Sequence, residues 1–303
     1  VARALSYSPS TISQQLSQLE AETGERLLEP VGRRVRLTPQ AEILVEHTEA
    51  LLARLERAEA DLAASLHAVT GTLRVAAFQT AALNLIPAAL TDLAGRHPAL
   101  RVRFTQMEPE RALPGLLAHD FDLVIGEEYP GHPQPLPPQF EQRDLSHDPL
   151  RLVLPRFPAD PSEPVGLTAL ADRAWVREPE GTAARQWSVA LCRTAGFEPD
   201  VRFESSDLML HLRLVETGHA VALLPDLVWA GRPPTVDRHP LPGAPARRIS
   251  TIVRRGAERH PAVEALRDSL SRSVRPRRQG GPQPVSRART AASSGAPTPA
   301  SAR

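Results

Sequence analysis

The sequence predicts an α/β protein with a winged helix-turn-helix head, one long helix behind it, and then two open α/β sheets in succession. Three observations support this fold class. A capped helix rich in Ser and Gln precedes an arginine-bearing hairpin within residues 2–38. An apolar repeat with alternating spacings of four and three follows, from residue 39 to about residue 69. Beyond Gly71, short apolar segments alternate with helical ones, which is typical of parallel α/β sheets.

The first predicted helix begins at Pro9 and ends near Thr23. Ser8 precedes Pro9, an order that suits an N-cap hydroxyl followed by a proline at the first helical position. Gly24 stands where a left-handed C-terminal cap is expected. The apolar stripe of this helix consists of Ile12, Leu16 and Leu19.

The opposite face of this helix carries hydroxyl and amide side chains that both donate and accept hydrogen bonds. Such a face suits base edges in a DNA major groove, although an ordinary surface helix also has a solvated polar side. The flanking segments favour DNA binding. Residues 2–5 are expected to end a preceding helix and residues 6–7 to form the turn. Residues 31–37 are expected to form two strands around a glycine, with arginines placed to contact phosphates. The candidate DNA-contacting residues are Pro9, Ser10, Ser13, Gln14, Ser17, Gln18, Arg33, Arg34 and Arg36.

The run SPSTISQQLSQLEAETGERLLEPVGRRVRLT, residues 8–38, resembles the winged helix-turn-helix of LysR-type transcriptional regulators. The likeness lies in the capped Ser-rich helix, the Leu-Glu pair, the Gly-Arg-Arg wing and the final Leu-Thr. Pro30 departs from the pattern, because the family usually has an arginine there. The chain also starts near the end of the family's second helix, as if it were truncated or begun at a wrong start codon. We therefore expect this 303-residue form to bind DNA poorly even if a longer form binds well.

Composition sets further limits on partners and location. The net charge is +1, and the 36 basic residues are all arginine. Residues 1–70 hold more acidic than basic side chains, so moderate DNA affinity per monomer and hence a dimer or larger assembly are expected. Cys192 is the only cysteine, which excludes an intrachain disulfide and a cysteine metal cluster. No apolar run approaches the roughly 18 residues that span a bilayer, and no signal peptide is recognisable, so a cytoplasmic protein without a membrane partner is expected.

The long predicted helix, residues 39–70 with its C-terminal turn, offers a candidate dimer seam. The alternative is that this face packs against its own chain. In the resembled family this segment is the linker helix, which pairs antiparallel with its partner in dimers or tetramers. The seam positions are Leu44, Thr48, Leu51, Leu55, Ala58, Leu62, Ser65 and Val69.

The remaining segments form two sets of strands and helices. The first set has strands at 73–78, 100–104 and 122–126 and helices at 80–95 and 109–118. A Pro-rich loop at 130–138 precedes the second set, with strands at 150–155, 174–177, 201–203 and 220–225 and helices at 182–195 and 206–217. A strand at 249–254 and a helix at 261–273 follow.

The resemblance extends over about residues 1–275, because VETGHAVALLP at 215–225 follows a second family pattern. It implies a two-lobed, periplasmic-binding-protein-like effector domain, in which the last strand and helix return to the first subdomain. The expected domains are 1–38, 39–70 and 71–275, with subdomain I at about 71–145 plus 247–275 and subdomain II at about 146–246. Residues 276–303, rich in Arg, Pro and Ser, are expected to be disordered, either attracting DNA or simply solvated.

A ligand is expected outside the carboxyl ends of the strands, as in other open α/β sheets. The candidate effector-contacting residues there are Gln79, Thr80, Glu108, Glu127 and Ser206. Thr80 and Ser206 fall at predicted helix starts and serve as caps, as ligand contacts, or as both. In the resembled family, the residue aligned with Thr80 commonly touches the effector. Glu108, Glu127 and Glu128 favour an amine or guanidinium, whereas the helix starts favour an anion, so the ligand's charge stays open.

Other residue types give weaker signals. His97, His119 and His219 lack metal-binding spacing, and Cys192 is expected to be a buried, inert thiol. No cofactor is expected, and no Gly-rich phosphate loop, nucleophile elbow or metal pair supports an enzyme. The resemblance implies a regulator that binds an interrupted inverted repeat in a promoter and responds to a small-molecule effector. A two-lobed solute-binding module without DNA is the alternative, but it would need neither the 9–36 block nor the heptad repeat.

Overall fold

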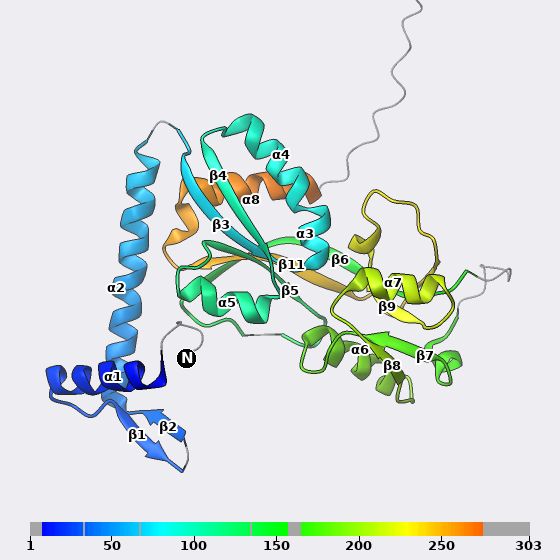
Figure 1. Ribbon diagram of the computed structural model, residues 1–303, viewed down its shortest axis with the longest axis horizontal. Coiled ribbons are helices and arrows are strands. Elements are labelled where there is room, and N and C mark those ends of the chain that lie inside the picture. The colour runs from blue at the N-terminus through cyan, green and yellow to red at the C-terminus, as the bar shows by residue number, and fades with distance from the viewer. Residues whose placement is uncertain (1–7, 33, 67, 134, 157–164, 275–303) are drawn as a thin grey trace, which may run out of the picture.

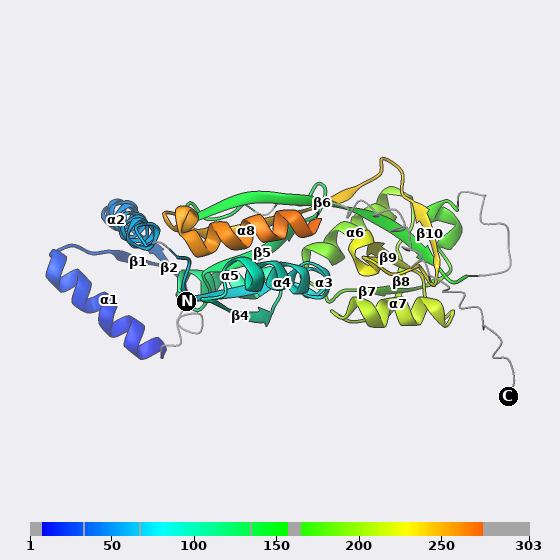
Figure 2. The ribbon, with the colours of Figure 1, turned by 90° about the horizontal axis from the view of Figure 1, so that it is seen from above.

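The computed structural model describes residues 8–32, 34–66, 68–133, 135–156 and 165–274. A small head and a long helix stand at one end of an elongated molecule, and a two-lobed body forms the rest (Figure 1). A view from above shows the two lobes side by side, with the head beyond lobe I (Figure 2). Lobe I is formed by residues 71–145 and 246–274, and lobe II by residues 150–240.

The head contains helix α1 (Pro9–Thr23) and the hairpin of β1 (Leu28–Val31) and β2 (Arg34–Leu37). The predicted caps of α1 are confirmed: the Ser8 hydroxyl accepts the Thr11 N–H at 3.1 Å, and Gly24 has a left-handed φ of 71°. The hairpin starts three residues earlier than expected, because Leu28 already pairs with Leu37. The predicted helix end and turn at 2–7, Arg33 and the C-terminal tail lie outside the described residues.

The apolar stripe of α1 is not covered by the described part of the chain. None of the residues of α1 is buried; Ile12 and Leu16 are half-buried, and Leu19 is 38% exposed. The Glu20 carboxylate instead links helix to hairpin, because it accepts the backbone N–H groups of Leu27 at 2.8 Å and Leu28 at 3.1 Å. These bonds lower the pKa of Glu20.

Helix α2 (Pro39–Ala64) ends five residues before the predicted end at Val69, which packs instead against the core of lobe I. One side of α2, with Ala53 and Ala60 buried, lies against the short helix η3 (Ala257–Arg259). The middle of the predicted seam is exposed, with Leu51 71%, Leu55 57% and Leu62 71% exposed. The helix therefore packs against its own chain on one side and leaves the seam open on another.

Lobe I is a sheet covered by helices on both faces. Its strands are β3 (Gly71–Ala77), β4 (Leu100–Gln106), β5 (Leu123–Glu128) and β11 (Ala246–Arg254), and its helices are α3 (Gln79–Asn84), α4 (Ile86–Arg96), α5 (Pro109–Leu117) and α8 (Pro261–Val274). Strand β3 is parallel to β4 and β5, whereas β11 is antiparallel to β5. Val75 packs with α4 and α8, while its neighbour Ala76 packs with α5, as alternation along a strand requires. The single helix predicted at 80–95 is divided at Leu85.

Lobe II shares a strand with lobe I. Strand β6 (Phe140–Leu154) pairs with β11 in lobe I and with β9 (Ala222–Pro225) and β10 (Asp237–Pro240) in lobe II. The ribbon of β7 (Ala174–Arg177) and β8 (Asp200–Glu204) joins this sheet through a bridge between Trp175 and Val221. Helices α6 (Ala183–Thr194) and α7 (Leu208–Glu216) and the short helices η1 (Leu167–Leu170) and η2 (Asp226–Trp229) complete the lobe.

Two crossovers connect the lobes, and they run side by side. One is the middle of β6 and the other is the entry into β11: Pro149 pairs with Ala246, and the Leu150 N–H donates to the Pro245 carbonyl at 2.9 Å. The two predicted sheets are thus continuous through β6, whose first ten residues were not predicted as a strand. The two lobes are therefore joined at one place, where the crossovers pair. None of the helices in the described ranges has the length and apolar character that a membrane span needs.

Candidate functional site

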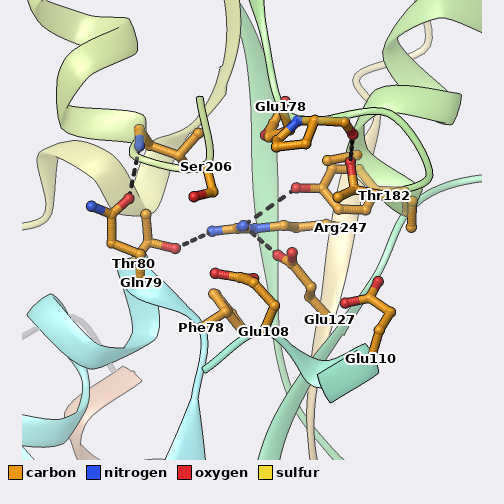
Figure 3. Close-up of a pocket in the computed structure, with 15 residues that line it drawn as sticks. Phe78, Gln79, Thr80, Glu108, Glu110, Glu127, Glu178, Thr182, Ser206 and Arg247 are labelled. Atoms are coloured by element: carbon orange, nitrogen blue, oxygen red, sulfur yellow. Dashed lines mark hydrogen bonds and ion pairs between the residues drawn. The ribbon is translucent and has the colours of Figure 1, made fainter. Parts of the chain in front are cut away.

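A cleft opens between the two lobes beside the crossovers, with a volume of about 490 Å³ including its mouth. All five residues predicted at the strand ends, Gln79, Thr80, Glu108, Glu127 and Ser206, line it together (Figure 3). The other lining residues are Phe78, Glu110, Tyr129, Glu178, Pro179, Thr182, Ala183, Ala184, Leu208 and Arg247. Because both lobes contribute, a molecule in the cleft would contact both at once.

Arg247 lies at the centre of the cleft wall, and its side chain is only 1% exposed. Its Nε and Nη2 donate to Asp148 Oδ2 at 3.0 and 2.8 Å, and Nη2 also donates to the Thr80 hydroxyl at 2.7 Å. Nη1 donates to Glu127 and, at 3.5 Å, to the Tyr129 hydroxyl. One arginine on β11 thereby joins lobe I to the neighbouring crossover, where Asp148 lies.

The electrostatics of the cleft are set by carboxylates around this one cation. Burial raises the pKa of Glu127 to about 7 even though Arg247 opposes the shift. Burial, followed by the charges of Glu127 and Glu110, raises the pKa of Glu108 to about 7. Burial also raises the pKa of Glu178. For Arg247, burial alone disfavours the charged form, but the adjacent acidic groups outweigh it and raise its pKa.

Thr80 and Ser206 are not the N-caps that the sequence suggested. Helix α3 begins at Gln79, so Thr80 lies inside its first turn, fully buried, where its hydroxyl accepts from Arg247. Helix α7 is capped by Asp207, whose carboxylate accepts the Met209 N–H at 2.8 Å, and Ser206 is exposed one residue earlier. The cap interpretation is wrong for Ser206 because a carboxylate one position later takes that role, and for Thr80 because α3 begins one residue before it. Ligand contact by either residue stays a prediction.

Gln79 bridges the lobes at the edge of the cleft. Its Nε2 donates to Asp207 Oδ1 at 2.6 Å, and its Oε1 accepts the Leu208 N–H at 2.8 Å. Farther along α3, Asn84 Nδ2 donates to the Leu227 carbonyl at 2.7 Å. The contact with Gln79 lowers the pKa of Asp207. These bonds link the two lobes directly.

The predicted DNA-facing residues lie on the surface of the head. Pro9, Ser10, Ser13, Gln14, Ser17 and Gln18 are all exposed on α1, and Arg34 and Arg36 are exposed on β2. Arg36 forms an ion pair with Glu29 on the facing strand, with Nε to Oε1 at 2.7 Å, so part of its charge is balanced within the hairpin. The other polar side chains of this face are exposed to solvent. Some of them make local hydrogen bonds, such as Gln18 Nε2 to Glu22 Oε1 at 2.8 Å.

Comparison with known families decides what this architecture is. Residues 66–275 match the LysR substrate binding domain, and residues 1–42 match the bacterial regulatory helix-turn-helix protein of the lysR family. The chain belongs to the LysR family. Being a LysR protein, it is a DNA-binding transcriptional regulator with a domain for a small-molecule effector.

LysR relatives share most of the length of the chain. The transcriptional dual regulator GltC of Bacillus subtilis is 26% identical over 229 residues, 74% of each chain. A probable hydrogen peroxide-inducible genes activator of Mycobacterium avium is 30% identical over 227 residues, 74% of this chain and 71% of its own. A full-length OxyR variant from Pseudomonas aeruginosa has the same fold, with a TM-score of 0.61 at 22% identity, covering 89% of this chain and 87% of that one.

A structure of full-length CbnR with its target DNA also resembles this chain. Its TM-score is 0.54 at 25% identity, and the match covers 90% of this chain and 92% of that one. The likeness therefore includes a LysR protein in its DNA-bound form.

The wall of the LysR cleft depends on Arg247, which lines it, and on Asp148 behind Arg247, and the sequence revealed neither. Neither residue belongs to a sequence motif, because the role of each depends on partners about a hundred or more residues away along the chain. Cys192 is buried as expected, and burial raises its pKa although Arg177 Nη2 donates to its sulfur at 3.1 Å. Within the described ranges, no group of three or more His, Cys, Asp or Glu is placed to hold a metal ion.

Proposed function

We propose that this LysR regulator binds its effector in the cleft around Arg247 and converts binding into a change in the angle between its lobes. The observation that carries the proposal is the position of Arg247. It sits on one crossover, bonds to Asp148 on the other, and reaches Thr80 and Glu127 of lobe I at the cleft wall. A ligand that prefers one arrangement of these contacts shifts the population of lobe angles.

Strand β11 connects this cleft to the helix that carries the head. Arg247 lies near one end of β11, and Arg254 ends the strand at the other. Arg254 forms an ion pair with Glu56 of α2 and donates to the carbonyls of Leu116 at 2.9 Å and Phe121 at 2.7 Å. Next to it, Gly256 approaches the α2 backbone so closely that an added Cβ would lie 2.3 Å from the Ala53 carbonyl oxygen. Movement of β11 is therefore passed directly to α2.

The head then reads DNA in a dimer or larger assembly. Exposed leucines along α2 supply the pairing face, and two heads at a fixed spacing match an interrupted inverted repeat. The Ser and Gln side chains of α1 face the major groove, while Arg34 and Arg36, with Arg33, contact phosphates. We place this activity in the cytoplasm, where the DNA is, and assign no enzymatic step to the chain.

Fluorescence anisotropy with the chain's own upstream intergenic DNA tests this function, both for this chain and for a form extended by its upstream codons. Specific binding should exceed binding to random duplex at physiological salt by about 10³-fold or more. Arg34→Ala should weaken binding to every duplex alike and reduce the salt slope by about one, whereas Gln14→Ala should alter sequence preference. Equal binding of both forms to cognate and random duplex would contradict the proposal.

A further inference from the structure

We propose that the effector of this cleft is an organic cation, a small molecule that carries an amine or guanidinium group. The inference rests on the proposed function only in taking the cleft as the effector site. It concerns the ligand's charge, which neither the family nor the relatives assign. Three features of the cleft carry it: its surplus of carboxylates, the occupied donors of Arg247, and the occupied amides at the start of α7.

The carboxylates come from both lobes and converge on one space. Glu108 and Glu110 lie at the start of α5, Glu127 near the end of β5, and Glu178 directly after β7 in lobe II (Figure 3). The carboxylate of Glu108 makes no hydrogen bond or ion pair with any residue in the described ranges, and burial and neighbouring acids raise its pKa. A carboxylate in this position gains most from a positive charge that enters the cleft.

The arginine of the cleft, Arg247, has no free nitrogen with which to bind an anion. All three guanidinium nitrogens of Arg247 already donate to protein groups, and two of its partners, Glu127 and Asp148, are themselves charged. An anionic ligand could reach Arg247 only by displacing these bonds and would then face four glutamates. Like charges brought together in a half-buried site repel each other, so this position disfavours an anionic ligand.

The first backbone amides of α7, at one edge of the cleft, are occupied as well. The Leu208 N–H, first in α7, is taken by Gln79, and the Met209 N–H is taken by the Asp207 carboxylate. The start of this helix therefore does not present the free donors that anion sites use.

The geometry also favours an extended organic cation over a metal ion. No trio of metal-ligating side chains is assembled anywhere in the described ranges, so the glutamates are spread around the space instead of converging on one point. A molecule with one or two cationic ends reaches separate carboxylates across such a space.

Thermal unfolding of the full chain with a matched set of small molecules tests this proposal. The cations are 1,4-diaminobutane and agmatine; the controls are 1,4-butanediol, succinate and calcium chloride, all at equal ionic strength. We expect a cation to raise the Tm and the controls to leave it unchanged. Glu108→Gln should weaken the apparent affinity about tenfold, a change of about 1.4 kcal/mol.

Glu128→Gln is the matched control variant. It removes the same charge from a residue next to Glu127 on β5, but Glu128 pairs with Arg248 at 2.7 Å and does not line the cleft, so its effect on cation affinity should be under twofold. The proposal is overturned if succinate or calcium stabilises the protein as the diamines do, if neither cation stabilises it, or if Glu108→Gln changes nothing. These measurements contain no DNA, so failure of operator binding leaves them intact.

Discussion

Replacing Arg247 by methionine should destabilise the protein strongly, and in a pH-dependent way. The substitution keeps a long apolar stem but leaves Glu127 and Asp148, with side chains 14% and 7% exposed, without their counter-charge. Breaking a buried ion pair by removing one partner typically costs about 3–5 kcal/mol. We expect a loss of this size in the free energy of unfolding at pH 8.

The pH dependence follows from the carboxyl pKa values. Burial already raises the pKa of Glu127 to about 7, and loss of Arg247 removes the main opposing interaction, so the folded variant holds a proton that the unfolded chain releases. A raised carboxyl pKa favours folding at low pH and loses that advantage as the pH rises. The penalty should therefore shrink on going from pH 8 to pH 6, by up to about 1.4 kcal/mol per pH unit for each such carboxyl.

Urea unfolding at both pH values measures this, with Arg248→Met as the control. Arg248 is adjacent in sequence, but its side chain is 32% exposed and pairs with Glu128 and Asp144 outside the cleft. Its removal should cost about 0–1 kcal/mol at either pH. The reasoning is refuted if the two variants lose equal stability, or if the Arg247→Met penalty grows as the pH falls.

Three further variants test other contacts. Gly256→Ala should lower the free energy of unfolding in urea by about 2–3 kcal/mol, because φ is +103° and the new Cβ meets the α2 backbone. The control Gly231→Ala, with φ +76° and open space around it, should lower it by about 1 kcal/mol. Equal losses would contradict close packing of α2. Gln79→Ala removes the bonds to Asp207 and Leu208 and should enlarge the radius of gyration in X-ray scattering, and an unchanged profile would show that the lobes are held otherwise. Glu108→Gln should stabilise the protein by about 1 kcal/mol at pH 8 and by less at pH 5, because the raised pKa penalises the ionised form; a gain that increases toward pH 5 would contradict this sign.

The sequence predicted those elements whose signals are local. Helix α1 carries its own start and stop in Ser8, Pro9 and Gly24, and the strand at 174–177 is a compact apolar run between polar segments. The first ten residues of β6 were missed because FEQRDLSHDP has no apolar alternation, and pairing with β11, about a hundred residues away, holds them in a strand. The end of α2 was placed too late because Val69 continues the apolar spacing but packs on lobe I.

The sequence predicted several residues that line the cleft but not Arg247 at its centre. Topology places the strand ends at one edge, so Gln79, Thr80, Glu108, Glu127 and Ser206 could be grouped without a structure. The role of Arg247 depends on a crossover that brings it to partners on three separate segments, and in a chain with 36 basic residues one arginine carries no signal of its own. The ligand's charge likewise needs the geometry, because it depends on which carboxylates already have partners.

In the proposed mechanism, the cleft and the DNA-reading head are coupled through β11 and α2. The most direct test is the dissociation constant for operator DNA with and without saturating 1,4-diaminobutane, in the wild type and in Arg254→Met, which loses the ion pair to Glu56 but leaves the cleft intact. The account predicts at least a fivefold change in the wild type, about 1 kcal/mol, and little or none in the variant, which still binds the diamine. An equal change in both proteins would contradict it.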